Sequence, residues 1–279
     1  MAVVVVTDSS ATLDPQSVAT LGIKVVPLHV LIDGSELHEG VDEIPADYLS
    51  GNKVTTSGAS PGELLTAFTA AHEASGGDGV LGVFISRKLS ATWEAARAAE
   101  SEFDGRLRIV DSQSAAMGVG FPALAAARRA ASGATLDDAY AAAVSVTWRA
   151  RSFVVVDRLD HLRRGGRISA TAALLGTALA MKPVLHMVDG RLVPKEKTRT
   201  ASKALATLVD SVVADAGPGS AAVAVQHIGA AEKAADVATQ LRERIPKLTE
   251  LAIAEFSPTL GVHLGPGAVG VVVVPGGIE

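Results

Sequence analysis

Short runs of apolar residues alternate along the chain with longer stretches in which apolar positions recur every three or four residues. The short runs predict buried strands, and the longer pattern predicts amphipathic helices. Their alternation is typical of α/β proteins in which helices flank mainly parallel sheets. The predicted strands are 3–6, 25–32, 80–85, 107–110, 153–156, 183–188, 191–194, 221–227, 250–256 and 268–274.

Two of the predicted helices have recognisable first turns. Ser60-Pro61-Gly62-Glu63 combines a capping hydroxyl, a proline at the first helical position and a glutamate at the third. Thr135 precedes Asp137 and Asp138, which suit the positive end of a helix dipole. Further helices are predicted at 90–102, 113–132, 170–181, 200–215 and 230–244.

The elements fall into two predicted α/β domains, 1–150 and 151–279. The boundary is placed where a helix ends near Trp148 and a new strand begins. In the second domain, Asp189-Gly190 lies between two predicted strands and indicates a tight hairpin turn. We therefore expect one antiparallel pair in that domain.

Composition narrows the class of protein. Of 279 residues 48% are hydrophobic but only 4% aromatic, so the core must be mainly Val, Leu, Ile and Ala. The absence of cysteine excludes disulfides and thiolate metal sites, and a net charge of −5 disfavours nucleic acid as a partner. The apolar run at 2–6 lacks a preceding basic segment, and no apolar stretch approaches the ~18 residues of a membrane span. We expect a cytoplasmic protein without stable membrane insertion.

Hydroxyl-rich turns recur in the first domain. Thr7–Ser10, Ser86–Thr92 and Asp111–Ser114 each follow a predicted strand, and Thr55–Gly58 forms a predicted loop before a capped helix. Ordinary helix capping explains any one such turn. Four of them favour a pocket, because the carboxyl ends of parallel strands meet at one edge of a sheet. Hydroxyls and free N–H groups there would hold a small molecule with a carboxylate head.

The chain resembles the DegV family of bacterial fatty-acid-binding proteins in five stretches that occur in the family's order and cover nearly the whole sequence. They are Thr7-Asp8-Ser9-Ser10, Thr56-Ser57-Gly58-Ala59-Ser60-Pro61, Ile85-Ser86-Arg87-Lys88-Leu89-Ser90-Ala91-Thr92, Leu162-Arg163-Arg164-Gly165-Gly166-Arg167-Ile168-Ser169 and His263-Leu264-Gly265-Pro266-Gly267-Ala268. The resemblance implies two α/β domains with a tunnel between them for a long-chain fatty acid such as palmitate, stearate or oleate. It implies no cofactor and no catalytic residues. The partner would be the catalytic subunit of a fatty acid kinase, which phosphorylates the carboxylate to an acyl phosphate for phospholipid synthesis.

The resemblance also assigns roles to individual residues. Thr56, Ser90 and His263 would contact the carboxylate, and Arg167 and Arg199 would lie on the surface that meets the kinase. The same turns supply further ligand-binding candidates, namely Ser57, Ala91 and Thr92, with Ser9 in a supporting role.

The sequence departs from the family's usual pattern at two places. It has Ser90-Ala91-Thr92 where the family usually has Ser-Gly-Thr, and Gly58-Ala59 where Gln-Pro is usual. Alanine would restrict the backbone if position 91 needs a positive φ. Details of head-group binding therefore depend on these two turns.

The chemistry of the residues is compatible with this reading. A carboxylate in a dry tunnel needs several hydrogen-bond donors, which hydroxyls and one imidazole can supply. His263 lies in a glycine-rich segment, 261–267, that predicts irregular structure. The segment 265–270 fits the dinucleotide pattern G-x-G-x-x-G, but it opens a strand and not a helix, which excludes that function.

Two alternatives stay open. One is a hydrolase or phosphotransferase that acts on a small carboxylate or ester through a serine, His263 and an aspartate, although no Gly-x-Ser-x-Gly motif is present. The other is a module that binds a different small anion. The seven histidines show no His-x3-His spacing, so no metal site is expected. The basic residues at 163–167 and 195–199 suit either an anionic partner or plain solvation.

Overall fold

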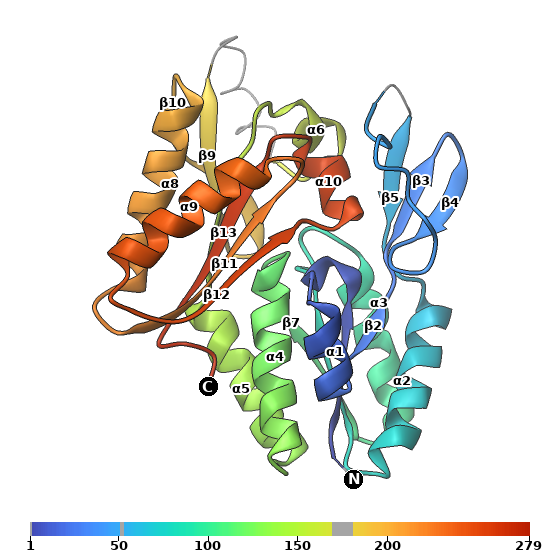
Figure 1. Ribbon diagram of the computed structural model, residues 1–279. Coiled ribbons are helices and arrows are strands. Elements are labelled where there is room, and N and C mark those ends of the chain that lie inside the picture. The colour runs from blue at the N-terminus through green and yellow to red at the C-terminus, as the bar shows by residue number, and fades with distance from the viewer. Residues whose placement is uncertain (1, 51–52, 169–180) are drawn as a thin grey trace.

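The computed structural model describes residues 2–50, 53–168 and 181–279 (Figure 1). The first half of the chain forms a four-stranded sheet in the order β2-β1-β6-β7, and all three pairs are parallel. Its strands are β1 (Val4–Asp8), β2 (Lys24–Val26), β6 (Val80–Phe84) and β7 (Leu107–Asp111). The predicted α/β class and parallel sheet are confirmed for this half.

Helices cover both faces of the parallel sheet, which is why its strands are apolar at most positions. The helices are α1 (Pro15–Leu21), α2 (Pro61–Ser75), α3 (Thr92–Ala98), α4 (Met117–Ala131) and α5 (Leu136–Arg149). Helices α2 and α3 pack on one face, while α4 and α5 pack on the other. The predicted capping boxes at Ser60 and Thr135 are both present.

The second half forms a six-stranded sheet in the order β10-β9-β8-β13-β11-β12. Its strands are β8 (Arg151–Val155), β9 (Lys182–Val188), β10 (Arg191–Thr198), β11 (Ser220–His227), β12 (Lys247–Glu255) and β13 (Val269–Pro275). Only β11 and β12 pair in parallel, so the expectation of a mainly parallel sheet with one antiparallel pair is wrong here. Apolar runs report burial on both faces of a strand, and they carry no information about its direction. The hairpin at Asp189-Gly190 is confirmed, with φ of 48° and 76°.

Helices also cover both faces of the second sheet. Helices α8 (Ala201–Ala216) and α9 (Ala231–Arg244) pack on one face. The other face contributes to the same apolar cluster as α4 and α5 from the first half. Because this core crosses position 150, the division into domains 1–150 and 151–279 stays a prediction.

A third, smaller sheet stands beside the other two (Figure 1). It consists of β3 (His29–Ile32), β4 (Ser35–His38) and β5 (Val54–Ser57), antiparallel in the order β4-β3-β5. The predicted strand 25–32 is therefore two strands, because the chain leaves the parallel sheet at Pro27. The prediction of a loop at Thr55–Ser57 is wrong, since β-branched threonines suit a strand as well as a turn.

The described residues also include two short α-helices, α6 (Asp160–Arg164) and α10 (Pro258–Leu264), and two 3-10 helices, η1 (Ser9–Ala11) and η2 (Ala99–Phe103). Irregular structure was expected around His263, but that residue lies in the last turn of α10. Ser257 caps the helix and Pro258 opens it, signals as clear as those at Ser60. The helix predicted at 170–181 falls almost wholly outside the described residues. Within the described ranges, no helix has the length and apolarity that a membrane crossing requires.

Asp8 ties the end of β1 to the end of β6. The carboxylate is fully buried and accepts hydrogen bonds from Ile85 N–H at 2.8 Å and Ser10 N–H at 3.0 Å. Burial raises the pKa of this carboxyl from 3.8 to about 6, an effect that these hydrogen bonds oppose and the nearby Glu39 carboxylate reinforces. The folded chain therefore holds this proton more tightly than the unfolded chain does.

We predict a pH dependence of stability that Asp8→Asn removes. The contribution of protonated Asp8 is complete below pH 3.8 and is lost as the pH rises through about 6. The free energy of unfolding of the unchanged chain, relative to that of the variant, should fall by about 2 kcal/mol between about pH 4 and pH 7. Urea unfolding of both chains across this range measures it, and a constant difference would contradict the raised pKa.

Candidate functional site

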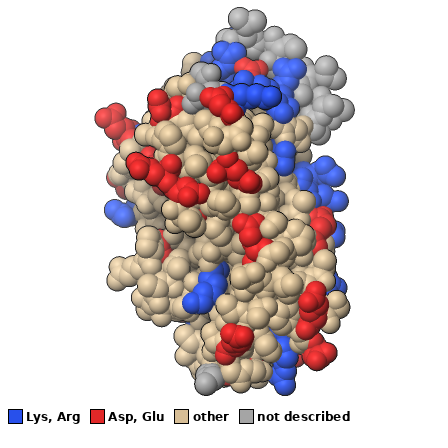
Figure 2. All heavy atoms as spheres, turned by 90° about the vertical axis from the view of Figure 1, so that its right-hand side faces the viewer, with Lys and Arg blue, Asp and Glu red and all other residues tan. Residues whose placement is uncertain are grey.

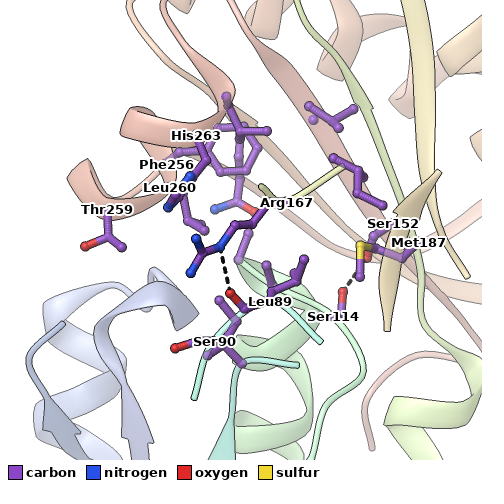
Figure 3. Close-up of a pocket in the computed structure, with 18 of the residues that line it drawn as sticks. Leu89, Ser90, Ser114, Ser152, Arg167, Met187, Phe256, Thr259, Leu260 and His263 are labelled. Carbon is purple, nitrogen blue, oxygen red and sulfur yellow. Dashed lines mark hydrogen bonds between the residues drawn. The ribbon is translucent and has the colours of Figure 1, made fainter. Parts of the chain in front are cut away.

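A pocket lies between the three sheets, and most of its lining is apolar (Figure 3). Apolar side chains come from the end of β6, from β8, β9 and β10, from the residue after β12, and from α10. They include Ile85, Phe153, Met187, Leu192, Phe256 and Leu260. Ser90, Arg167 and His263 lie at one end of the lining (Figure 3), together with Thr56, which is hydrogen-bonded to His263. We call these four residues the polar end of the pocket.

The hydrogen bond between Thr56 and His263 joins β5 to α10. Thr56 Oγ1 lies 2.8 Å from His263 Nε2, although the two residues are 207 positions apart in the sequence. Burial lowers the pKa of His263 to about 4, and the positive charge of Arg167 adds to the effect. The imidazole is therefore neutral at pH 7. When its Nε2–H donates to Thr56 Oγ1, the Thr56 hydroxyl proton is free to donate to a ligand.

The other ring nitrogen of His263 packs against the backbone. Among the described residues, none forms a hydrogen bond with His263 Nδ1. A Cβ atom added to Gly165 would lie only 2.2 Å from this nitrogen. The glycine after α6 is thus required for His263 to take this position.

Ser90 and Thr92 form a second hydroxyl pair. Their oxygen atoms are 2.9 Å apart, and Thr92 N–H donates to Ser90 Oγ at 3.3 Å. Ser90 lines the pocket, whereas Thr92 is buried behind it and Ala91 is exposed. Ala91 has a φ of −77°, so alanine is unstrained where the family usually has glycine.

Gly58 lies against this hydroxyl pair. A Cβ atom at Gly58 would be 2.6 Å from Thr92 Oγ1 and 3.0 Å from Ser90 Oγ. The structure thus explains why glycine stands at position 58, where the family usually has glutamine. The backbone at Gly58 approaches the two hydroxyls more closely than a side chain permits. Ser57, next to Gly58, also lines the pocket but is exposed to solvent.

Arg167 and Arg199 lie in different environments. Arg167, expected on the outer surface, is half-buried and lines the pocket, where its Nε–H donates to Leu89 O at 3.0 Å and its Nη1–H to Gly165 O at 2.5 Å. Arg199 is exposed just beyond β10 and does not line the pocket.

Ser9 lies outside the pocket lining and supports α10 instead. Its hydroxyl donates to the buried Glu39 carboxylate and accepts from Leu28 N–H at 2.9 Å. The other oxygen of Glu39 accepts from Thr259 N–H at the start of α10. Ser9 and Glu39 thus fix the helix that carries His263.

Sequence reasoning missed most of the lining. Ser114 and Ser152 line the pocket away from the polar end, and their hydroxyl oxygens are 2.9 Å apart (Figure 3). Gln226 also lines it, and its Oε1 accepts from Met117 N–H at 3.0 Å. Ser152 and Gln226 lie inside β8 and β11, where no local motif marks them. Ser114 belongs to the hydroxyl-rich turn Asp111–Ser114, which was predicted from the sequence.

Comparison with known proteins gives consistent matches along the chain. The DegV family model matches residues 2–276. A DegV domain-containing protein from Mycobacterium tuberculosis is 48% identical over 273 residues, which are 98% of this chain and 97% of that relative.

Solved structures match over the same length. A DegV family protein from Corynebacterium glutamicum has a TM-score of 0.87 at 36% identity, covering 99% of this chain and 98% of its own. A DegV family protein from Thermus thermophilus, described as binding fatty acid, has a TM-score of 0.92 at 30% identity, covering 99% and 100%.

We predict that Gly58→Ala destabilises the protein by about 1–3 kcal/mol, because the new methyl group collides with Thr92 Oγ1 and forces the hydroxyl pair apart. Gly62→Ala is the matched control. No atom lies within 4 Å of a Cβ at Gly62, and alanine favours the helix there. Urea unfolding compares the two variants, and equal stability of both would show that the close approach at Gly58 has no energetic consequence.

Proposed function

The chain belongs to the DegV family, and on that premise we propose that it binds a long-chain fatty acid in the pocket described above. The carboxylate would lie at the polar end, in contact with Thr56, Ser90 and His263, and the acyl chain would extend along the apolar lining. The observation that carries the proposal is the pocket itself, whose apolar wall ends at two hydroxyls and a neutral imidazole.

Both the acyl chain and the carboxylate of a fatty acid would contribute favourably to the free energy of binding. Each methylene that leaves water contributes roughly 0.8 kcal/mol, so the tail supplies most of the affinity. Hydrogen bonds to a charged carboxylate contribute about 1.5–3 kcal/mol each, and the cation of Arg167 lies at the same end. The polar end therefore favours the orientation in which the carboxylate lies beside Arg167.

We further propose that the protein presents this carboxylate to a separate kinase. Arg199 is exposed, and Arg167 reaches the polar end of the pocket. Arg163 and Arg164 are exposed on the last turn of α6, a helix that packs against α10. Figure 2 shows Lys and Arg side chains gathered at the top of the face that it displays. A basic surface of this kind attracts an acidic partner face or a phosphate donor.

A hydrolase is the weaker candidate. Thr56 and His263 are hydrogen-bonded as a nucleophile and its base would be, but the base in such enzymes is oriented by a third group. In the ranges that the structure describes, His263 Nδ1 has no hydrogen-bond partner. Its pKa of about 4 also makes it a poor proton acceptor. A carrier needs neither property.

We expect the protein purified from a bacterial host and denatured in organic solvent to release a fatty acid, which mass spectrometry would identify. Protein that is empty and takes up no added palmitate, stearate or oleate would overturn the proposal.

Thr56→Val should weaken fatty acid binding by about 10–100-fold, because one hydrogen bond to the carboxylate is lost.

Two controls make the effect of Thr56→Val specific. The matched variant is Thr55→Val, the exposed neighbour on β5, which should bind fatty acid normally. The matched ligand is the corresponding fatty alcohol, which has no carboxylate and should bind to Thr56→Val and the unchanged chain alike. Equal loss of acid and alcohol would place the hydroxyl in the tail region instead.

We predict that Arg199→Ala leaves fatty acid affinity unchanged but lowers the rate of acyl-phosphate formation by about tenfold when the kinase subunit and ATP are supplied. Arg167→Ala should weaken both, since Arg167 also lines the pocket. Arg242→Ala, an exposed arginine on α9, is the control and should change neither. A normal rate with both Arg167→Ala and Arg199→Ala would refute the assignment of the kinase-facing surface.

A further inference from the structure

Three potential metal ligands converge outside the pocket, where the small sheet meets α2. His29 lies on β3, His38 on β4 and Glu63 in the first turn of α2. Glu63 Oε1 is 2.9 Å from His29 Nε2 and 3.7 Å from His38 Nε2, and one ligand atom from each residue lies within 4.8 Å of the others. His29 is buried, whereas His38 and Glu63 are reached by solvent.

Each of these positions follows from local structure. His29 and His38 are directly opposite each other in the antiparallel β3–β4 pair, and their ring centroids are 4.4 Å apart. Glu63 is the third residue of α2, and its Oε2 accepts from the N–H and the hydroxyl of Ser60 at 2.8 and 2.6 Å. The capping box thereby holds the carboxylate with its Oε1 turned toward the imidazoles.

The outward nitrogen of each imidazole faces a carboxylate. His29 Nδ1 is 2.7 Å from Glu36 Oε1, and His38 Nδ1 is 3.0 Å from Asp42 Oδ2. Metal-binding histidines usually donate their second ring N–H to a carboxylate in this way, which fixes the tautomer and raises the basicity of the ligand nitrogen. Both rings therefore have the surroundings that imidazoles have in a metal site.

The spacing fits a tetrahedral ion. With Zn–N and Zn–O distances near 2.0–2.2 Å, neighbouring ligand atoms in a tetrahedral site are about 3.3 Å apart. From Glu63 Oε1 the separation is 2.9 Å to His29 Nε2, a hydrogen bond that the ion would replace, and 3.7 Å to His38 Nε2. These two values lie on either side of the expected one. We propose that His29 Nε2, His38 Nε2 and Glu63 Oε1 bind a divalent transition-metal ion, of which Zn²⁺ suits this ligand set best. Water would take the fourth position on the side of the half-buried His38, which solvent reaches.

The proposed metal site is separate from the pocket, but it lies on the small sheet that carries Thr56. His29 pairs with Ser57 on β5, while the next pair in the register is Val30 with Thr56. Successive side chains of a strand point to opposite faces, so the histidines lie on the face away from His263. An ion there would join the β3–β4 hairpin to the start of α2. It would thereby hold the short connection between β5 and α2, which contains Gly58 beside the Ser90–Thr92 hydroxyl pair.

We expect tag-free protein, freed of metal with a chelator, to bind one Zn²⁺ per chain in isothermal titration calorimetry, with a melting temperature that rises with zinc concentration. His38→Gln and Glu63→Gln should each weaken zinc binding at least tenfold, and Asp42→Asn about 10–100-fold. Glutamine at position 63 can still accept the capping bonds from Ser60, so this variant should fold.

Two variants on the same helix serve as matched controls. His72→Gln and Glu73→Gln change residues of α2 outside the cluster and should leave zinc affinity unchanged. Absence of zinc binding would overturn the proposal, as would affinity that is unaffected by His38→Gln and Glu63→Gln. Fatty acid release is measured separately, so failure here leaves the proposed function intact.

Discussion

The docking of α10 against the small sheet is the contact on which the pocket depends. Tyr48 Oη–H donates to Pro258 O at 3.0 Å, and the buried Glu39 carboxylate accepts from Thr259 N–H. A Cβ atom at Gly261 would lie only 1.9 Å from Tyr48 Oη, so the tyrosine can approach the helix only because this position is glycine. Without these contacts the helix has too few residues to hold itself in place, and the polar end of the pocket would lose its imidazole.

Features that depend on local sequence could be predicted, and features that depend on contacts between distant segments could not. Strands and long helices were found because burial on both faces and capping residues such as Ser60 leave local marks in the sequence. The direction of the strands in the second sheet was not predicted correctly. Pairing such as that of β13 with β8 depends on contacts between segments that are far apart in the sequence. The short helix at His263 was taken for irregular structure, although Ser257-Pro258 opens it, because its glycines outweighed the cap.

The candidate site likewise contains residues that the sequence marked and residues that it did not. Hydroxyl turns and family motifs marked Thr56, Ser90 and His263, and the structure places all three in the lining of one pocket. Ser9 was marked for its hydroxyl as well, yet it supports α10 through Glu39. The apolar lining could not be predicted, since a Leu or Val beside a ligand has the same pattern as one in a core. His29 and His38 escaped a search by spacing because a hairpin, and not a helical turn, brings them together.

The strand order of the large sheet has a consequence for the way the protein is made. Strand β13 lies in the centre of that sheet, between β8 and β11, yet the ribosome synthesises it after the other five strands. The parallel sheet of the first half can form as its strands emerge. The larger sheet must wait with β8 and β11 unpaired along the edges that β13 will fill, and such edges favour association with other chains. Its closure through contacts between distant segments is also intrinsically slow. The nascent chain is therefore most vulnerable to aggregation just before its final strand is added.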